Sequence, residues 1–300
     1  MTDLRVLTRI LSTSRRVAYV PGFRQRYVTD LDWEERALNR LPRRVRQMKH
    51  WIAFLARYGF DVREGRILEV ATGPGFDTRL LAALTAGALS TIDIHPRFSI
   101  GAREYPGYGR LHARLDAHVD GDLRFPPLTD ATRYRFLQMD ARALAFPDDS
   151  FDLVFCKSTL KMIPSPEQAM AECLRVLRPD GLLLVIDEPF TSVFGLCRGG
   201  VIDVPWAHVY LTEEEFKEVL PSEERARSKA LENWRSVSRL TRERLVEATQ
   251  GGAVLLSERY GYDDLPASFV EEVLGIVPEL ESVGPERLRI VEGELLFRKL

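Results

Sequence analysis

Apolar residues recur at intervals of three and four between Asp32 and Tyr58, which is the pattern of one face of an α-helix. The opposite face of this segment carries several arginines. Gly59 follows, a residue type that commonly ends a helix, and Pro42 interrupts the segment. The pattern therefore predicts two consecutive helices over 32–58. Its apolar positions are Trp33, Ala37, Leu38, Leu41, Val45, Met48, Trp51, Ile52, Leu55 and Tyr58.

A different pattern follows Gly59, because the apolar residues now come in short runs separated by amphipathic stretches. The runs span 66–70, 89–94, 134–139, 151–156 and 182–186. Helices are expected to begin near Asp77 and at Pro166, the second with Ser165 as its N-cap. Short buried runs that alternate with helices are typical of β-α-β units. We therefore predict an α/β fold with a mostly parallel central sheet and helices on both faces.

Two long stretches interrupt this alternation, at 97–133 and at 191–250. The second contains Thr212-Glu-Glu-Glu215, a capping box that predicts the start of another helix. Residues 294–299 are able to supply a closing strand. No internal repeat is present, which disfavours solenoid and propeller architectures.

The composition is that of an ordinary globular chain of 300 residues, 45% hydrophobic and 29% charged, with a formal net charge of −2. This balance disfavours a strongly basic nucleic-acid binder. Cys156, Cys173 and Cys197 form no C-x-x-C pair, which favours a reduced, cytoplasmic location. No apolar run reaches the length of a signal peptide or a membrane span, so secreted and membrane classes are not expected.

The charges are unevenly distributed along the chain. Residues 1–60 hold 13 Lys or Arg against 5 Asp or Glu, whereas residues 255–300 hold 10 acidic against 5 basic side chains. Two interpretations remain open. The oppositely charged ends are solvated or attract each other, or the basic N-terminal face receives an anionic substrate or an acidic surface.

The segment 67–77 combines a short apolar run, two glycines and the start of a helix. Gly73 and Gly75 let a ligand lie close to the backbone, and the helix N-terminus offers free N–H groups. Glu69 stands four residues before Gly73. A carboxylate there repels a dinucleotide pyrophosphate and attracts a ligand with an ammonium group. The third glycine of a dinucleotide-binding motif is also missing, because Thr78 occupies its position.

Two further acids end the next two predicted strands. A carboxylate at Asp93 is placed to accept hydrogen bonds from both hydroxyls of a ribose. An acid at Asp140 is placed to accept from an adenine amino group, and the backbone N–H that follows is able to reach a ring nitrogen. Three acids at the tips of three strands form a stronger signal than any one of them.

Together these features resemble the class I S-adenosylmethionine-dependent methyltransferases, in the branch often called methyltransferase type 11. The resemblance covers about 66–189. Besides the glycine segment, it rests on Asp93-Ile94, Gln138-Met-Asp-Ala141, Phe146-Pro147, Phe151-Asp-Leu-Val154 and Leu174-Arg-Val-Leu-Arg-Pro-Asp-Gly181. It implies a Rossmann-like class I methyltransferase fold and S-adenosyl-L-methionine as the cofactor.

The resemblance also implies roles for individual residues. The methionine part of the cofactor is expected at Glu69, Ala71, Thr72, Gly73 and Gly75, the ribose at Asp93 and Ile94, and the adenine at Asp140 and Ala141. Cys156 and Lys157 are expected to line the sulfonium end.

The sequence departs from the family pattern in two places. Ala71 stands where the family usually has its first glycine, which costs little if the φ angle there is negative. After the fourth strand, the segment 158–162 lacks the His pair common in quinone-type members, which speaks against that substrate class.

Three parts are expected along the chain: an N-terminal helical cap over 1–62, the cofactor-binding core over 63–190, and a substrate-side insertion with the closing strands over 191–300. The first and last parts would cover the open edge of the cofactor and admit a small-molecule or glycan-type acceptor. Methyl transfer is an in-line displacement, which a general base assists if the acceptor is a hydroxyl. His208 is the candidate base, followed by Asp187 and Glu188.

Other functions remain open. A methyltransferase-like protein can serve as a non-catalytic binding subunit, and an NAD-dependent oxidoreductase is opposed by Glu69 and the missing third glycine. Nucleic acid is a disfavoured partner, because no Asn/Asp-Pro-Pro-aromatic tetrad follows the fourth run. No metal site is predicted, although ligand-type residues gather on one polar insertion, at His112, Asp116, His118, Asp120 and Asp122. The oligomeric state is not predicted.

Overall fold

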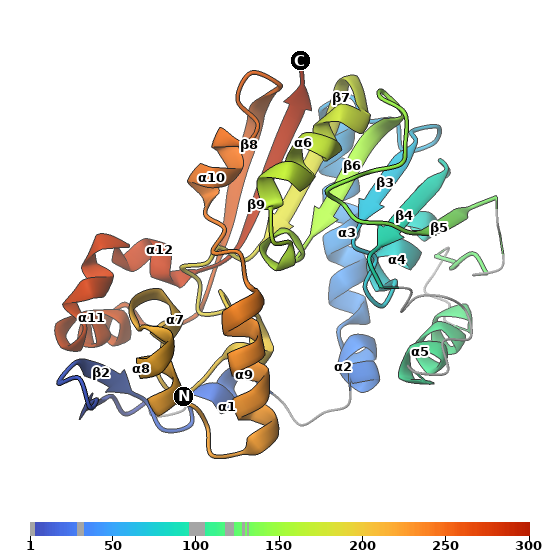
Figure 1. The fold of residues 1–300 in the computed structure, drawn as a ribbon. Helices are drawn as coiled ribbons and strands as arrows, with labels where there is room; N and C mark the ends of the chain where they lie inside the picture. Colours follow the sequence, from blue (N-terminus) through green and yellow to red (C-terminus); the bar gives the residue numbers. More distant parts are fainter. Residues whose placement is uncertain (1–3, 29–32, 96–105, 118–122, 128–129, 131) are drawn as a thin grey trace.

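The centre of the molecule is a seven-stranded sheet with the strand order β5-β4-β3-β6-β7-β9-β8 (Figure 1). The computed structural model describes residues 4–28, 33–95, 106–117, 123–127, 130 and 132–300. The strands are β3 (Ile67–Val70), β4 (Leu89–Asp93), β5 (Tyr134–Gln138), β6 (Phe151–Lys157), β7 (Leu177–Asp187), β8 (Ala253–Tyr262) and β9 (Ile290–Lys299). The first five are parallel and correspond to the five predicted runs, whereas β9 pairs antiparallel with both β7 and β8.

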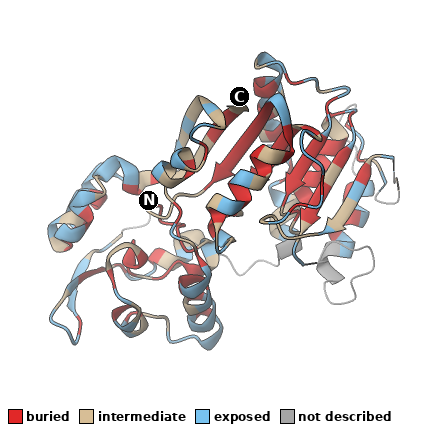
Figure 2. Ribbon diagram, turned by 45° about the horizontal axis from the view of Figure 1, so that its top comes forward, coloured by how far each residue is buried: buried red, intermediate tan, exposed pale blue. Residues whose placement is uncertain are grey.

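Helices cover both faces of this sheet, as the apolar runs predict. One face packs against α3 (Leu41–Arg57), α4 (Phe76–Leu84) and α5 (Pro106–Asp116), the other against α6 (Pro166–Val176) and α10 (Arg242–Glu247). Successive strand residues alternate between the two cores, so that Ile67 belongs to the first and Leu68 to the second. The inner strands β3, β4, β6 and β7 are accordingly mostly buried, whereas the edge strands β5 and β8 are more exposed (Figure 2).

The N-terminal helices follow the predicted pattern. The chain forms α2 (Trp33–Asn39) and then α3, with Pro42 in the first turn of α3, where a missing N–H is tolerated. Gly59 follows with a φ of 92°. The apolar side of α3 buries Met48 and Trp51, and the Trp51 Nε1 donates to Glu294 Oε1 of β9 at 2.8 Å. This helix is therefore packed onto the sheet.

A second lobe lies at the carboxyl ends of the parallel strands (Figure 1). It is assembled from three separate stretches that share two apolar clusters, one around Phe23, Trp206 and Phe269 and one around Phe216 and Trp234. Its elements are β1 (Leu7–Ile10), β2 (Arg16–Tyr19), α1 (Phe23–Tyr27), η3 (Arg198–Gly200), α7 (Ala207–Tyr210), α8 (Glu213–Glu218), α9 (Glu224–Ser236), α11 (Ala267–Ile276), η4 (Pro278–Ser282) and α12 (Pro285–Arg289). A short turn, η2 (Leu160–Met162), follows β6.

The lobe shows what the sequence patterns caught and missed. The capping box at Thr212 and Glu215 opens α8 as predicted. The N-terminal part is not wholly helical, because β1 and β2 form an antiparallel hairpin. The hairpin escapes the pattern because all four residues of β1 are exposed.

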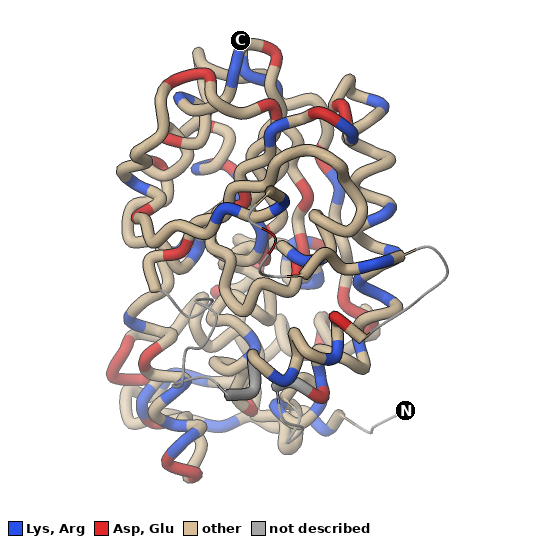
Figure 3. Tube along the Cα trace, turned by 90° about the vertical axis from the view of Figure 1, so that its right-hand side faces the viewer, with Lys and Arg blue, Asp and Glu red and all other residues tan. Residues whose placement is uncertain are grey.

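The charged ends of the chain partly attract each other. Arg26 pairs with Asp264 and lies 3.8 Å from Asp263, and Arg15 Nε lies 3.9 Å from Glu279. Basic and acidic residues are spread along the whole trace in the view of Figure 3. Among the described helices, none combines the length and the apolar character that a membrane crossing requires.

Candidate functional site

A cavity of about 430 Å³ opens at the carboxyl edge of the sheet. Its walls follow β3 and β6, the neighbouring strands between which the strand order reverses. Ligands of open α/β sheets bind at this kind of position. The lining residues are Arg36, Ala37, Arg40, Arg44, Glu69, Val70, Ala71, Thr72, Gly73, Pro74, Phe76, Asp77, Lys157, Ser158, Thr159 and Arg198.

The turn after β3 forms the floor of this cavity. Gly73 has a φ of 53° and open space where a Cβ would lie, so a ligand is able to approach the backbone there. Gly75 has a φ of 72° and is the N-cap of α4. Ala71 has a φ of 61°, so the favourable condition of a negative φ at this position is not met, and the alanine occupies a left-handed conformation.

Glu69 is buried where β3 meets the cavity. Thr78 and Thr91 both donate to its Oε2, the latter at 2.9 Å, so the residue at the missing third glycine holds the carboxyl in place. Among the described residues, no donor reaches Oε1. Burial raises the pKa of Glu69 to about 8, Asp77 adds to this, and the two threonines and Lys157 oppose it. A positively charged ligand group beside Glu69 would lower this pKa and favour the ionised carboxylate.

Lys157 and Asp77 form an ion pair in the same wall, with 2.5 Å between Nζ and Oδ2. Burial alone would raise the pKa of Asp77, but Lys157 and Arg44 outweigh it and hold that pKa below its usual value. Lys157 therefore lies in the cavity wall, with its charge balanced by Asp77, a residue for which the sequence analysis gives no role in the site.

Asp93 lies beside the turn, at the end of β4. Its Oδ2 accepts from the Gly73 N–H at 2.8 Å and its Oδ1 from the His95 N–H at 2.9 Å. This ties the glycine turn to the neighbouring strand. Ile94 is 54% exposed, an apolar side chain open to a flat ligand next to the turn.

Asp140 and Ala141 follow β5 on the same edge of the sheet. Both carboxylate oxygens of Asp140 accept from Arg142, with 2.7 Å between Nη2 and Oδ2. A ligand that used Asp140 would compete with this pair. Asp93 ends β4 and Asp140 follows β5, the two strands that come next to β3 in the sheet order, but neither residue lines the cavity.

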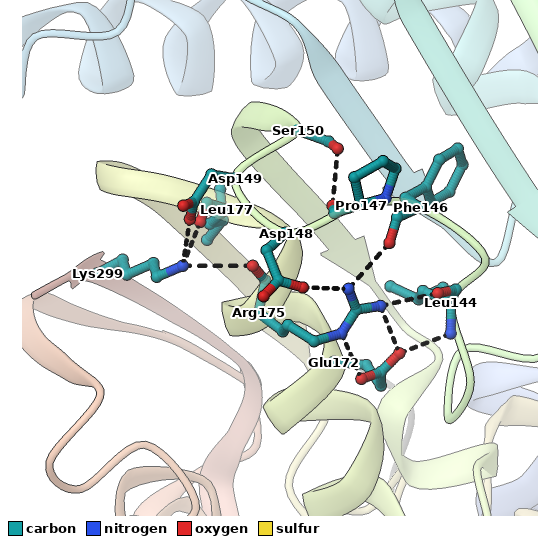
Figure 4. A network of polar contacts seen from close by, with 10 residues as sticks. All are labelled: Leu144, Phe146, Pro147, Asp148, Asp149, Ser150, Glu172, Arg175, Leu177 and Lys299. Carbon is teal, nitrogen blue, oxygen red and sulfur yellow. Dashed lines mark hydrogen bonds and ion pairs between the residues drawn. The ribbon is translucent and has the colours of Figure 1, made fainter.

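The loop that carries Asp140 is anchored from behind by the network in Figure 4. Arg175 of α6 donates to the Leu144 and Phe146 carbonyl oxygens at 2.7 and 2.9 Å, and also to Asp148 and Glu172. Glu172 in turn accepts from the Leu144 N–H at 2.7 Å. The network fixes the loop four residues beyond Asp140.

Ile94, Ala141, Cys156 and His208 are likewise absent from the cavity walls, and the last two are buried elsewhere. Cys156 is 1% exposed and packs in the core between the sheet and α6, where burial raises its pKa well above the usual value. His208 is buried in the second lobe, and its Nε2 lies 2.8 Å from the Phe190 carbonyl oxygen. Burial lowers the pKa of His208 to about 4.

The next candidates for a base form a buried cluster around Lys161. The Lys161 N–H donates to Asp187 Oδ2 at 3.2 Å, and its ammonium group pairs with Glu188. Neither Asp187 nor Glu188 belongs to the walls of the large cavity. The geometry therefore assigns no base.

The polar insertion does not assemble a metal site in its described part. The His112 ring Nε2 lies 3.1 Å from the Pro74 carbonyl oxygen, and Asp116 pairs with Arg79 at 2.5 Å. His118, Asp120 and Asp122 lie outside the described residues. Within the described parts of the chain, no group of three or more His, Cys, Asp or Glu is placed to hold a metal ion.

The cavity wall also holds four arginines that the sequence analysis does not name as site residues, although three of them belong to its basic N-terminal segment: Arg36, Arg40, Arg44 and Arg198. The first three follow each other at intervals of four, a spacing that places them on one side of a helix. That signal is present in the sequence, in the basic segment that precedes the sheet. Arg198 comes from the distant insertion and carries no local signal.

Fold and site together define a Rossmann-like class I methyltransferase fold. Five parallel strands are followed in the sheet by the antiparallel strand β9 and the edge strand β8, and a buried acid and a glycine turn lie where the strand order reverses. Residues 68–185 match the family model of a methyltransferase domain, methyltransferase type 11. The resemblance to this family that the sequence predicts is thus confirmed for residues 68–185.

Curated relatives agree with this assignment. The chain is 33% identical over 143 residues to the ubiquinone/menaquinone biosynthesis C-methyltransferase UbiE of Stutzerimonas stutzeri, covering 46% of each chain. It is 29% identical over 128 residues to a phosphatidylethanolamine N-methyltransferase of Cereibacter sphaeroides, covering 43% of this chain and 53% of that protein. The chain thus spans about half the length of the curated relatives it matches.

Among solved structures, the chain is similar to a putative sarcosine dimethylglycine methyltransferase from Galdieria sulphuraria, with 17% identity and a TM-score of 0.47. The match covers 85% of this chain and 84% of that one.

Proposed function

We propose that this protein is an S-adenosylmethionine-dependent methyltransferase that acts on a small-molecule or glycan-type acceptor. The observation that carries the proposal is Glu69, a buried carboxyl in the wall of a cavity of about 430 Å³ beside the glycine turn, whose Oε1 receives no donor from the described residues. A buried carboxyl with a raised pKa suits a cationic ligand group, because the incoming positive charge stabilises the ionised form.

The residues present suit the cofactor. Glu69 would bind its ammonium group, the Gly73 backbone would lie against its methionine part, and Asp93 and Ile94 would meet the ribose. Asp140 and Ala141 would receive the adenine after the Arg142 pair opens. The cofactor, when bound, supplies a methyl group already activated on a sulfonium.

What remains for the protein is to hold the acceptor in line with that methyl group and to exclude water, and such positioning is worth about 7–11 kcal/mol in well-oriented reactions. Lys157, Ser158 and Thr159 after β6 and Arg198 from the second lobe border this side of the cavity. The two curated relatives are named for transfer to carbon and to nitrogen, so the acceptor atom is not assigned.

The cofactor is tested by thermal unfolding with S-adenosylmethionine, S-adenosylhomocysteine and NAD in parallel. We expect the first two to raise the Tm and NAD to leave it unchanged, and we expect Glu69→Gln to reduce the shift. A shift with NAD alone would support an oxidoreductase instead.

Catalysis is tested by incubating the protein with methyl-labelled S-adenosylmethionine and a metabolite extract. Label should move to an extract component with the native protein and not with Asp93→Asn. Tight binding of the cofactor without any transfer would indicate a non-catalytic binding subunit.

A further inference from the structure

Three of the cavity arginines form one row on the N-terminal helices. Arg36 belongs to α2, Arg40 is the N-cap of α3, and Arg44 lies in the first turn of α3. The Arg40 N–H donates to the Arg36 carbonyl oxygen at 3.2 Å, and the Arg44 N–H donates to the Arg40 carbonyl oxygen at 2.9 Å. The helical spacing therefore continues across the junction, and all three side chains reach the same wall.

Arg198 reaches the same cavity from the second lobe. Its guanidinium carbon lies 4.1 Å from the centroid of the Phe194 ring, a stacking contact that leaves its N–H donors open at the edges. Four guanidinium groups from two parts of the fold thus converge on one space.

These charges are poorly compensated. In the described part of the protein, Arg36, Arg40 and Arg198 have no ion pair, and Arg44 has only a 3.9 Å approach to Asp77. Glu188 favours the charged form of Arg198, but Glu188 is already paired with Lys161. Burial, then Arg198 and Arg44, lower the pKa of Arg40, which reports the mutual repulsion of the group. Like charges are gathered in this way where a counter-charge is supplied from outside.

The cofactor of the proposed function does not supply that counter-charge. Its sulfonium and ammonium groups are positive and its single carboxylate is negative, so it brings a net positive charge to the cavity. Asp77 already pairs with Lys157, and Glu69 is the group suited to the ammonium. One carboxylate is able to satisfy one of the arginines, and the others remain.

We propose that the methyl acceptor is an anionic small molecule whose phosphate or carboxylate group is held by Arg36, Arg40 and Arg198. The inference rests on the proposed function and adds the substrate class. Guanidinium groups bind these anions through paired N–H donors, and their fixed geometry orients the ligand as well as attracting it. The anionic group would be held at the mouth formed by α2 and η3, with the rest of the acceptor directed toward Lys157 and Thr159.

The test is calorimetric titration of the protein, saturated with S-adenosylhomocysteine, with inorganic pyrophosphate and with citrate at constant ionic strength. We expect one of these anions to bind with one-to-one stoichiometry. Arg40→Gln and Arg198→Gln should each weaken this binding about tenfold, the loss expected for a charge-assisted hydrogen bond. Arg46→Gln is the matched control, because Arg46 is exposed on the same helix and does not line the cavity. It should change the affinity less than about twofold, as screening of a distant surface charge predicts.

The outcomes separate the two proposals. If S-adenosylhomocysteine does not bind, the proposed function and this inference both fail. If it binds but neither anion does, the substrate class is wrong and the methyltransferase function stands. The same conclusion follows if the Arg40, Arg198 and Arg46 variants all lower the affinity for the anion equally. Competition between the anion and S-adenosylhomocysteine would also overturn the inference, because the arginines would then serve the carboxylate of the cofactor.

Discussion

Glu69 is buried, its Oε2 is held by two threonine hydroxyls, and its Oε1 receives no donor from the described residues. With a pKa of about 8 it is mostly protonated at pH 7 in the free protein. The folded chain therefore holds a proton that the unfolded chain, with an ordinary carboxyl, has already lost. Its contribution to stability is full below the ordinary pKa of 4.5 and is lost as the pH rises through 8.

This state predicts a proton linkage in cofactor binding. If Glu69 receives the ammonium group, it must ionise, so binding of S-adenosylhomocysteine at pH 7 should release close to one proton. Affinity should rise between pH 6 and 8, by at most about tenfold per pH unit. Calorimetry in two buffers of different ionisation enthalpy measures the release.

Two variants make the linkage specific to Glu69. Glu69→Gln should bind more weakly and release no proton, whereas Asp93→Asn should bind more weakly and keep the release. Equal proton release in the native protein and in Glu69→Gln would contradict the assignment.

His208 predicts a different pH response. Burial lowers its pKa to about 4, so the folded state resists the proton that the unfolded state takes up below pH 6.5. This neutral histidine stabilises the fold above pH 6.5, and the stabilisation is lost as the pH falls toward 4. His208→Gln should remove this pH dependence of the free energy of unfolding. The variant should be less stable than the native protein at pH 7, and this difference, measured by urea unfolding, should shrink by about 2 kcal/mol at pH 5.

The same variant tests a catalytic role. Because the ring lies outside the cavity wall, affinity for S-adenosylhomocysteine and label transfer should survive in His208→Gln. If the stability difference between the variant and the native protein stays constant with pH, His208 is not a buried neutral histidine. If methyl transfer is lost while cofactor affinity is kept, His208 has a catalytic role.

At the scale of elements, the turn from β3 into α4 stores strain at Ala71. A left-handed φ costs a residue with a Cβ about 1–2 kcal/mol, and glycine escapes that cost at a smaller loss of chain entropy. Ala71→Gly should therefore stabilise the protein by about 0.5–1 kcal/mol. Ala53→Gly, at an exposed position within α3, should destabilise it by about 1 kcal/mol. Urea unfolding measures the free energy of unfolding of both variants. If both are destabilised by the same amount, the turn at Ala71 is not strained.

The hydrogen bonds of Arg175 are a second feature at the scale of elements, because they join α6 to the loop after β5 (Figure 4). They hold Leu144 and Phe146 and so fix the loop after Asp140, where the adenine is expected. Arg175→Met should cost about 1–2 kcal/mol of stability, discounted for partial exposure. It should also weaken binding of both S-adenosylhomocysteine and adenosine several-fold.

Two comparisons interpret that result. Glu69→Gln should lower the affinity for S-adenosylhomocysteine but not the affinity for adenosine, because adenosine has no ammonium group. Arg178→Met removes an exposed pair with Asp152 away from the loop and should leave both affinities unchanged. If Arg175→Met behaves like Arg178→Met, the loop does not hold the adenine.

At the scale of the whole molecule, α3 is part of the core. It buries apolar side chains against the same sheet face as α4, and Trp51 and Phe155 are in ring contact at 5.8 Å. A chain that lacks residues 1–62 should therefore lose cooperative thermal unfolding and expose apolar surface to a fluorescent dye. A fragment 63–300 that unfolds cooperatively near the Tm of the full chain would show that the N-terminal part is a detachable cap.

The sequence reveals the sheet and the binding edge because both depend on local patterns. Each parallel strand contains a short, largely apolar run, and Glu69, Gly73 and Asp93 stand at or just after strand ends. The second lobe is not predictable in this way. Its core joins Phe23, Trp206 and Phe269 from three distant stretches, and such contacts leave no periodic trace.

The site shows the same limit. Cys156 alternates along β6 with residues of the opposite face and points into the core, whereas Lys157 after it faces the cavity. Arg198 enters the cavity only because the second lobe folds over the edge of the sheet. Asp77 and Arg44 acquire their role from a pairing that spans separate helices.

The most direct test of the account is a crystal structure with S-adenosylhomocysteine. The account predicts the ligand in the cavity at the ends of β3 and β6, with its amine on Glu69 Oε1, its ribose hydroxyls on Asp93, and open space beside Arg40 and Arg198. A cavity that stays empty at saturating ligand, or a ligand bound with its amine away from Glu69, would contradict it.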